Sequence, residues 1–152
     1  MLASYARQLF VARFLVQVCL LALVSLFAWR RGGGPEKAAA VALLASLAID
    51  QTYHALVAAP LYRQLDLWHM SLDVAMLAVM VGLALRSPRV WLLWMASLQT
   101  ISALGHVLHV IELAMPVVVY WAMITAPSWL QILLLAAGTY LNDQRRQVRQ
   151  LT

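Results

Sequence analysis

The sequence predicts an all-α membrane protein, a polytopic bundle of five transmembrane helices. Hydrophobic residues make up 64% of the 152 residues, against about 45–50% in soluble domains. Charged residues make up 11% and the mean hydropathy is +0.80. Five stretches reach the ~20 apolar residues that cross a hydrocarbon layer of about 30 Å. This composition excludes a soluble enzyme and a disordered protein, and the single cysteine excludes a disulfide scaffold. We expect one transmembrane domain covering residues 1–152.

The first two spans are separated by a short basic and glycine-rich turn. We expect the first span over residues 9–29, retained in the protein because no small-x-small cleavage pattern follows it. Arg30, Arg31 and three glycines end it. Pro35 and Glu36 then open the second helix, since proline suits the first helical position and an acid suits the first turn. This second span covers residues 37–59 and stops at Pro60.

The other three spans are predicted over residues 67–85, 90–111 and 115–141. The tetrapeptide 86–89 forms a turn between the third and fourth spans, and Asn142 with Asp143 ends the fifth. Pro127 lies within the fifth span, where it frees the carbonyl of Met123 and predicts a kink. Thr125 and Ser128 are the side chains expected to satisfy that carbonyl.

The arginines and lysines predict the orientation, because cytoplasmic loops carry an excess of positive charge. One side of the membrane carries Arg7, Arg13 and Arg63. The other carries Arg30, Arg31, Lys37, Arg86, Arg89, Arg145, Arg146 and Arg149. The N-terminus is therefore predicted outside and the C-terminus in the cytoplasm of a bacterial inner membrane. The net charge of +5 is thus a topology signal, with the lipid bilayer as partner and no role for nucleic acid.

Ionisable residues inside spans cost about 2.5–3.5 kcal/mol each on insertion scales, and so mark candidate functional positions. The candidate ligands are His106, Asp73, His54, His69, Asp50 and His109, supported by Gln99, Arg13 and Glu112. All are predicted in the periplasmic half, with nothing comparable in the cytoplasmic half. Asp50 with His54, and His69 with Asp73, are four residues apart, so each pair shares a helix face. Tyr120 and Trp121 are expected at the outer interface.

Four kinds of chemistry fit this layer of histidines and acids. Imidazoles and carboxylates bind transition metals. The second possibility is a haem b held between His54 and His106, with Met76 or Met80 as alternative axial ligand. The third is a proton or cation path. The fourth is structural: interhelical hydrogen bonds and an Arg13–carboxylate pair. No catalytic signature is present.

Three stretches resemble small uncharacterised alphaproteobacterial inner-membrane proteins. They are Arg31-Gly-Gly-Gly-Pro-Glu-Lys-Ala-Ala, Leu72-Asp-Val-Ala-Met-Leu-Ala continuing to Leu85-Arg-Ser, and Leu93-Trp-Met-Ala-Ser-Leu-Gln continuing to His106. The likeness covers residues 29–109 in patches. It implies that Asp73, Trp94, Gln99 and His106 are family-type positions, and it brings no activity with it.

The leading functional prediction is an integral inner-membrane subunit that binds a haem, a metal or a polar ligand through the His/Asp layer. The first alternative is a non-enzymatic accessory or oligomer-forming protein whose polar layer is a structural contact. The second is proton or small-solute transport through an oligomer. We accordingly expect a homo-oligomer or a subunit of a larger membrane complex.

Overall fold

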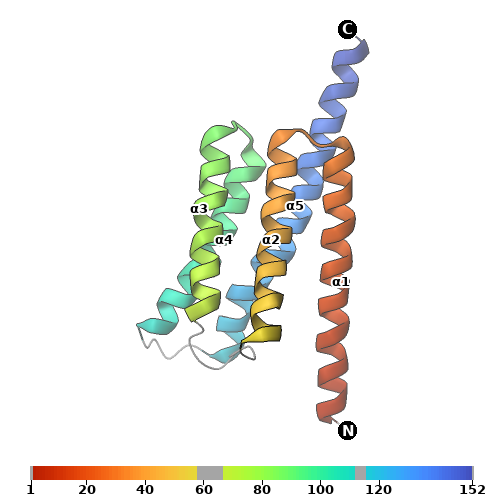
Figure 1. Cartoon of the computed structure of the whole chain (residues 1–152). Coiled ribbons are helices and arrows are strands. Elements are labelled where there is room, and N and C mark those ends of the chain that lie inside the picture. Colours follow the sequence, from red (N-terminus) through yellow and green to blue (C-terminus); the bar gives the residue numbers. More distant parts are fainter. Residues whose placement is uncertain (1, 58–66, 112–115, 152) are drawn as a thin grey trace.

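The computed structural model describes residues 2–57, 67–111 and 116–151, and five helices account for nearly all of them (Figure 1). They are α1 (Leu2–Arg31), α2 (Gly34–Leu56), α3 (Leu67–Arg86), α4 (Val90–Val110) and α5 (Val117–Leu151). Each is long and apolar enough to cross a membrane. The predicted fold class is therefore confirmed.

The two ends of the bundle differ in which connections they carry. The N-terminus lies at one end, and the C-terminus lies at the other together with the α1–α2 and α3–α4 turns (Figure 1). We call these the N-terminal end and the C-terminal end. The basic residues of the two turns and of the last helix therefore gather at one end, as their spacing along the sequence predicts.

The short turns explain why the helices begin where they do. Pro35 lies in the first turn of α2, and the Glu36 carboxylate accepts a hydrogen bond of 2.8 Å from the Gly33 N–H. This bond satisfies one donor at a helix start, where four N–H groups lack intrahelical partners. The predicted opening by Pro35 and Glu36 is confirmed, although α2 begins at Gly34 and not at residue 37.

The prediction that Asn142 and Asp143 end the fifth helix is wrong, because α5 continues to Leu151. The following residues are mostly glutamine and arginine, which are good helix formers. Asn142 turns its side chain to Arg31 and Arg89 instead of competing for its own backbone. Gln147 donates to the Asp143 carboxylate one turn away at 3.2 Å. The predicted end of the second span at Pro60 lies outside the described residues.

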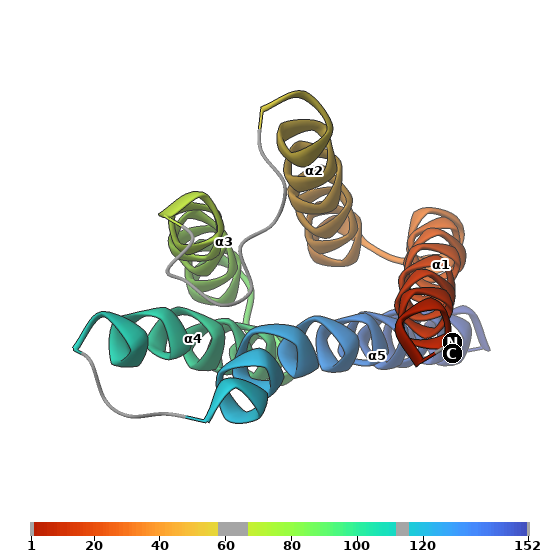
Figure 2. The same cartoon turned by 90° about the horizontal axis from the view of Figure 1, so that it is seen from below.

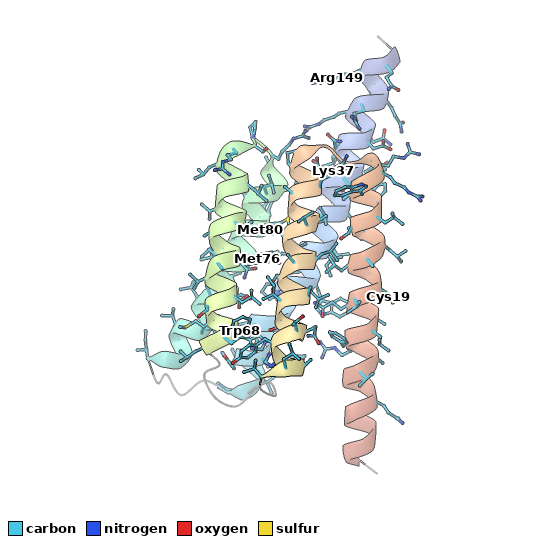
Figure 3. The ribbon with its side chains drawn as sticks, in the orientation of Figure 1. Cys19, Lys37, Trp68, Met76, Met80 and Arg149 are labelled. Atoms are coloured by element: carbon cyan, nitrogen blue, oxygen red, sulfur yellow. The ribbon has the colours of Figure 1, made fainter. Side chains whose placement is uncertain are left out.

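The helices form a ring in sequence order, which α1 and α5 close by packing together (Figure 2). Helix α5 runs obliquely, from beside α4 at its start to beside α1 near the C-terminal end. The middle of the ring is apolar: Met80, Leu92, Met95 and Leu135 are fully buried there. Figure 3 shows Met76 and Met80 at mid-height, and Trp68 near the N-terminal end.

Helix α5 passes through Pro127 without interruption. The Met123 carbonyl, which the proline leaves without its usual N–H partner, accepts a long hydrogen bond of 3.4 Å from the Ser102 hydroxyl of α4. The prediction that Thr125 and Ser128 satisfy this carbonyl is wrong. Those two hydroxyls donate to the carbonyls of Trp121 and Thr125 instead. The close approach of α4 to Met123 depends on Gly105, where an added Cβ would lie 3.3 Å from the Met123 Cβ.

Candidate functional site

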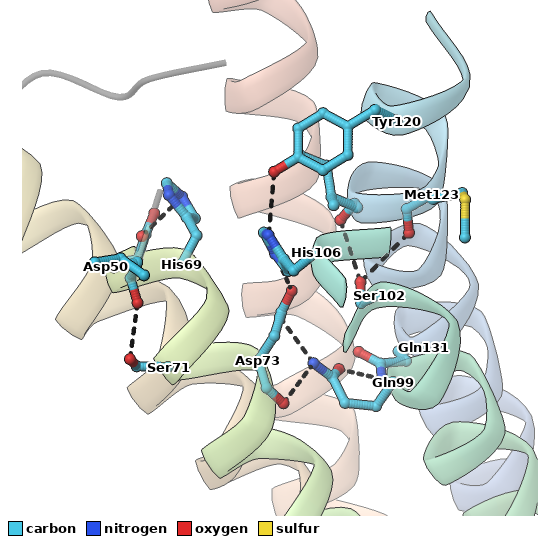
Figure 4. A network of polar contacts seen from close by, with 12 residues as sticks. Asp50, His69, Ser71, Asp73, Gln99, Ser102, His106, Tyr120, Met123 and Gln131 are labelled. Carbon is cyan, nitrogen blue, oxygen red and sulfur yellow. Dashed lines mark hydrogen bonds and ion pairs between the residues drawn. The ribbon is translucent and has the colours of Figure 1, made fainter. Parts of the chain in front are cut away.

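The polar residues of the predicted layer meet between helices α2, α3, α4 and α5 (Figure 4). They separate into two groups. The Asp50 cluster consists of Asp50, His54 and His69. The His106 chain consists of Tyr120, His106, Asp73, Gln99 and Gln131. The single layer expected from the sequence is thus two adjacent sites with different bonding.

The Asp50 cluster places two imidazoles on one carboxylate oxygen. Asp50 Oδ1 lies 3.4 Å from Nε2 of His54 and 3.1 Å from Nε2 of His69. The three potential ligand atoms all lie within 4.8 Å of one another, and all three side chains are half-buried. Two nitrogens and an oxygen therefore converge on one point between α2 and α3.

Local packing holds this cluster together. Asp50 and His54 are neighbours on one face of α2 because they are one turn apart, and His69 is the third residue of α3. The two imidazole rings stack with their centroids 4.8 Å apart. Beside them the rings of Tyr53 and Trp68 stack at 4.1 Å. These two ring pairs join the last turns of α2 to the first turn of α3.

The His106 chain runs across three helices. The Tyr120 hydroxyl lies 3.1 Å from Nδ1 of His106, and Nε2 of His106 lies 3.1 Å from Oδ2 of Asp73. The Gln99 amide nitrogen donates to Oδ1 of Asp73 at 2.8 Å. The Gln99 amide oxygen accepts from Gln131 at 2.9 Å. Each of the five side chains has a partner within the chain, so the chain stabilises the contact of α3, α4 and α5.

Both ring nitrogens of His106 are engaged. With Nε2 protonated, the ring donates to Asp73 and accepts at Nδ1 from the Tyr120 hydroxyl, so one tautomer satisfies both bonds. The ring is 1% exposed and Tyr120 is 3% exposed. To bind a ligand, His106 would have to give up one of these buried bonds.

Helix geometry explains why His69 and Asp73 belong to different groups although they are one turn apart. Four residues turn the helix by about 400°, so the two side chains diverge by about 40°. Helix α3 lies between α2 and α4 in the ring. His69 therefore reaches Asp50 on α2, and Asp73 reaches Gln99 and His106 on α4.

A cavity of about 210 Å³ separates the two groups. Asp50 and His69 line one part of its wall, and Asp73 and His106 line another. A deeper cavity of about 160 Å³ also borders Asp50 and Asp73 and reaches Gln131. Asp50 and His69 therefore border a partly open space, whose wall also carries the polar side chains of Arg13, Gln17 and Asp73.

Arg13 does not make the carboxylate pair expected of it. Among the described residues no acidic side chain forms an ion pair with it. Its guanidinium instead lies over the ring of Trp121, 4.5 Å from the centroid. The methionines proposed as axial ligands, Met76 and Met80, belong to the apolar core. The His109 side chain and Glu112 lie outside the described part of the structure.

Two members of the His106 chain were missed from the sequence. Tyr120 was expected at the membrane interface but is buried on His106. Gln131 is buried between α4 and α5, where it also donates to the Met95 carbonyl at 3.2 Å. The available signal was the spacing of Tyr120, Pro127 and Gln131, which places them along one face of a helix.

A second buried polar group lies at the C-terminal end, contrary to the prediction of none in that half. Glu36 is 0% exposed, and its Oε1 lies 3.9 Å from Nη1 of Arg89. Arg89 also donates to Asn142 at 3.3 Å, and Asn142 donates to the Arg31 carbonyl at 3.2 Å. The sequence predicts that Glu36 opens the second helix and that Arg89 lies in the turn before the fourth, but spacing along the chain does not reveal that folding brings the two side chains together.

Comparison with known proteins finds no matching family model, no matching curated sequence and no matching solved structure.

Proposed function

We propose that this protein is a multi-pass membrane protein that binds a divalent transition-metal ion, Zn²⁺ in the first place, at Asp50, His54 and His69. We further propose a bacterial inner membrane as its location, with the metal site in the periplasmic half. The observation that carries the metal proposal is the convergence of three ligand atoms within 4.8 Å, beside a cavity that Asp50 and His69 line.

The donor set suits zinc. Histidine nitrogens and carboxylate oxygens bind Zn²⁺ at about 2.0–2.2 Å, so tetrahedral ligand atoms are roughly 3.3 Å apart. Two of the separations in the cluster, 3.1 and 3.4 Å, already match that spacing. Three protein ligands leave the fourth coordination position of the zinc ion open. An open position is typical of sites that exchange water or a ligand, whereas closed structural sites have four protein ligands.

A haem between His54 and His106 is less well supported. The cavity of about 210 Å³ is smaller than the ~300–1,000 Å³ typical of sites for drug-sized ligands. His106 also has both nitrogens engaged. Proton or solute transport is less well supported too, because Met80, Leu92 and Met95 form a buried apolar core that lines neither cavity.

The structural alternative is favoured for the His106 chain alone. Its groups satisfy one another across three helices, as expected of interhelical contacts in membranes. We therefore assign metal binding to the Asp50 cluster and a structural role to the His106 chain, whose Asp73 and His106 also line the cavity.

Calorimetric titration of the detergent-purified protein with ZnCl₂ tests this function. We expect saturable binding of one ion per chain, weakened at least tenfold by Asp50→Asn and by His69→Ala. Asp143→Asn is the matched control, since Asp143 pairs with Arg31 at the opposite end. Because an ion that binds only the folded state stabilises it by about 2.7 kcal/mol at a hundredfold excess over Kd, zinc should also raise the Tm. Equal binding by wild type and both cluster variants would refute the proposal.

A further inference from the structure

An apolar groove lies between α1 and α5, next to the cavity but on the outside of the ring. It has a volume of about 580 Å³, and small residues on both helices, Ala12, Ala122 and Ala126, contribute to its walls. Val16, Trp129 and Leu130 complete an almost wholly apolar lining. The α5 residues involved span about 14 Å of helix at 1.5 Å per residue. In a bilayer such a groove is filled by acyl chain, because water gains no hydrogen bonds there.

The groove and the cavity meet at the same four residues. Arg13, Trp121, Thr125 and Trp129 line both. The apolar groove and the cavity that borders Asp50 therefore adjoin, with Arg13 at the junction, and only the cavity has carboxylate, imidazole and amide side chains in its wall. This arrangement matches an amphiphile, whose apolar chain needs an apolar groove and whose polar head needs neighbouring hydrogen-bonding side chains.

Arg13 fixes the charge of the group at that junction. Its guanidinium lies over the Trp121 ring, and in the described part of the chain no carboxylate pairs with it. A guanidinium binds phosphate oxygens through two parallel N–H donors. The junction therefore favours a phosphate ester.

The head group must supply the selectivity. An acyl chain gains little on moving from the bilayer into the groove, since lipid tails are as apolar as the groove itself. Beyond Arg13 the cavity offers the acceptors and donors of Asp50, Gln51 and Gln17. Hydroxyl groups suit these partners. An ammonium group would be repelled when Asp50 and the histidines hold a divalent cation.

We propose that the groove and cavity bind one phospholipid of the phosphatidylglycerol type, with a chain between α1 and α5, the phosphate on Arg13 and the hydroxyl-bearing head in the cavity. The inference deepens the proposed function, because it names the ligand class that reaches the open position of the metal. The preference for hydroxyl over ammonium head groups rests on that function, whereas the contact with Arg13 does not.

Native mass spectrometry of the full chain in detergent, titrated with dioleoylphosphatidylglycerol, tests the inference. We expect one lipid per chain to be retained, with an apparent affinity at least about tenfold weaker in Arg13→Gln, the size expected for loss of a hydrogen bond to a charged group. Arg30→Gln is the control, since Arg30 is an exposed arginine at the opposite end of α1.

Filling the groove provides a second test. Ala126→Trp and Ala12→Trp place an indole where the chain would lie, and each should abolish retention of the lipid while circular dichroism stays helical. Ala78→Trp introduces the same side chain at an exposed position of α3, outside the groove, and should retain the lipid. If all three variants retained the lipid equally, the retained lipid would be annular lipid that does not occupy the groove. This result would overturn the inference.

Zinc separates this inference from the proposed function. With zinc bound, the preference for dioleoylphosphatidylglycerol over dioleoylphosphatidylethanolamine should increase at least threefold. Zinc binding without Arg13-dependent lipid retention overturns the inference and leaves the metal function standing. Arg13-dependent retention without zinc binding refutes the metal function and supports the lipid site. Equal affinity for both lipids in the zinc-bound protein overturns the assigned head group.

Discussion

His106 has the most constrained side chain in the polar layer. It is almost completely buried, and each ring nitrogen faces a different partner on a different helix. A buried imidazole that loses one partner keeps the cost of desolvating the unpaired nitrogen, about 1–3 kcal/mol. The Tyr120 hydroxyl and the Asp73 carboxylate therefore set the tautomer and the orientation of this ring.

Replacing Tyr120 with phenylalanine should lower the free energy of unfolding by about 1–3 kcal/mol, because Nδ1 of His106 is left buried without its partner. The measurement is unfolding in mixed detergent micelles followed by circular dichroism. Zinc affinity should stay within twofold of wild type, since Tyr120 does not border the Asp50 cluster.

Tyr140→Phe is the control for this substitution. Tyr140 is 56% exposed, and its hydroxyl accepts a hydrogen bond from Gln144 on the surface of α5. Its loss should change the stability by less than about 0.5 kcal/mol. Equal destabilisation by both substitutions would contradict a special role for the His106 chain.

At the scale of elements, a side-chain donor on α4 replaces a missing backbone donor in α5. Pro127 has no N–H, and the Ser102 hydroxyl supplies a hydrogen bond to the Met123 carbonyl. Ser102→Ala should therefore destabilise the protein by about 0.5–1.5 kcal/mol. In a Pro127→Ala background, where the backbone N–H returns, the same substitution should cost less.

A double-mutant cycle in mixed micelles measures that difference. The expected coupling is at least 0.5 kcal/mol, within the range for residues that share a partner. Ser97→Ala is the reference, because Ser97 donates only to Leu93 of its own helix and should show no coupling to Pro127. If the effects of Ser102→Ala and Pro127→Ala on stability were fully additive, the Ser102 hydroxyl would not replace the missing backbone N–H.

The elements were more predictable from the sequence than their lateral contacts. Apolar length and the turns at Pro35 and 86–89 locate α3 and α4 within about a residue, since a bilayer sets span length directly. Spacing of four residues correctly joins Asp50 to His54. It does not reveal that Asp73 turns away from His69, which depends on the place of α3 between α2 and α4. Likewise, only the closed ring shows that Tyr120 and Glu36 are buried.

At the scale of the whole molecule, the charges define an orientation that can be tested. The exposed basic residues at the C-terminal end include Arg86, Arg146 and Arg149. With Cys19 replaced by alanine, Gln8→Cys should react with a membrane-impermeant maleimide added to spheroplasts. Gln150→Cys should react only after lysis, because the excess of positive charge predicts that this end faces the cytoplasm.

The two glutamines make a matched pair, since both side chains are exposed and lie in helices. The measurement is the mass shift of the chain before and after lysis. Reaction of Gln150→Cys in intact spheroplasts, with protection of Gln8→Cys, would reverse the orientation and would move the proposed metal site to the cytoplasmic side.

The contact between Asn142 and Arg31 has a consequence for biosynthesis. The two residues are 111 positions apart, and α1 leaves the ribosome long before α5 is made. Glu36 enters the membrane with α2, and the arginine that pairs with it follows only at the start of α4. The nascent hairpin of α1 and α2 is therefore a provisional structure. Closure of the ring by α1 and α5 is therefore expected to be a late step, because it requires the last helix to be synthesised first.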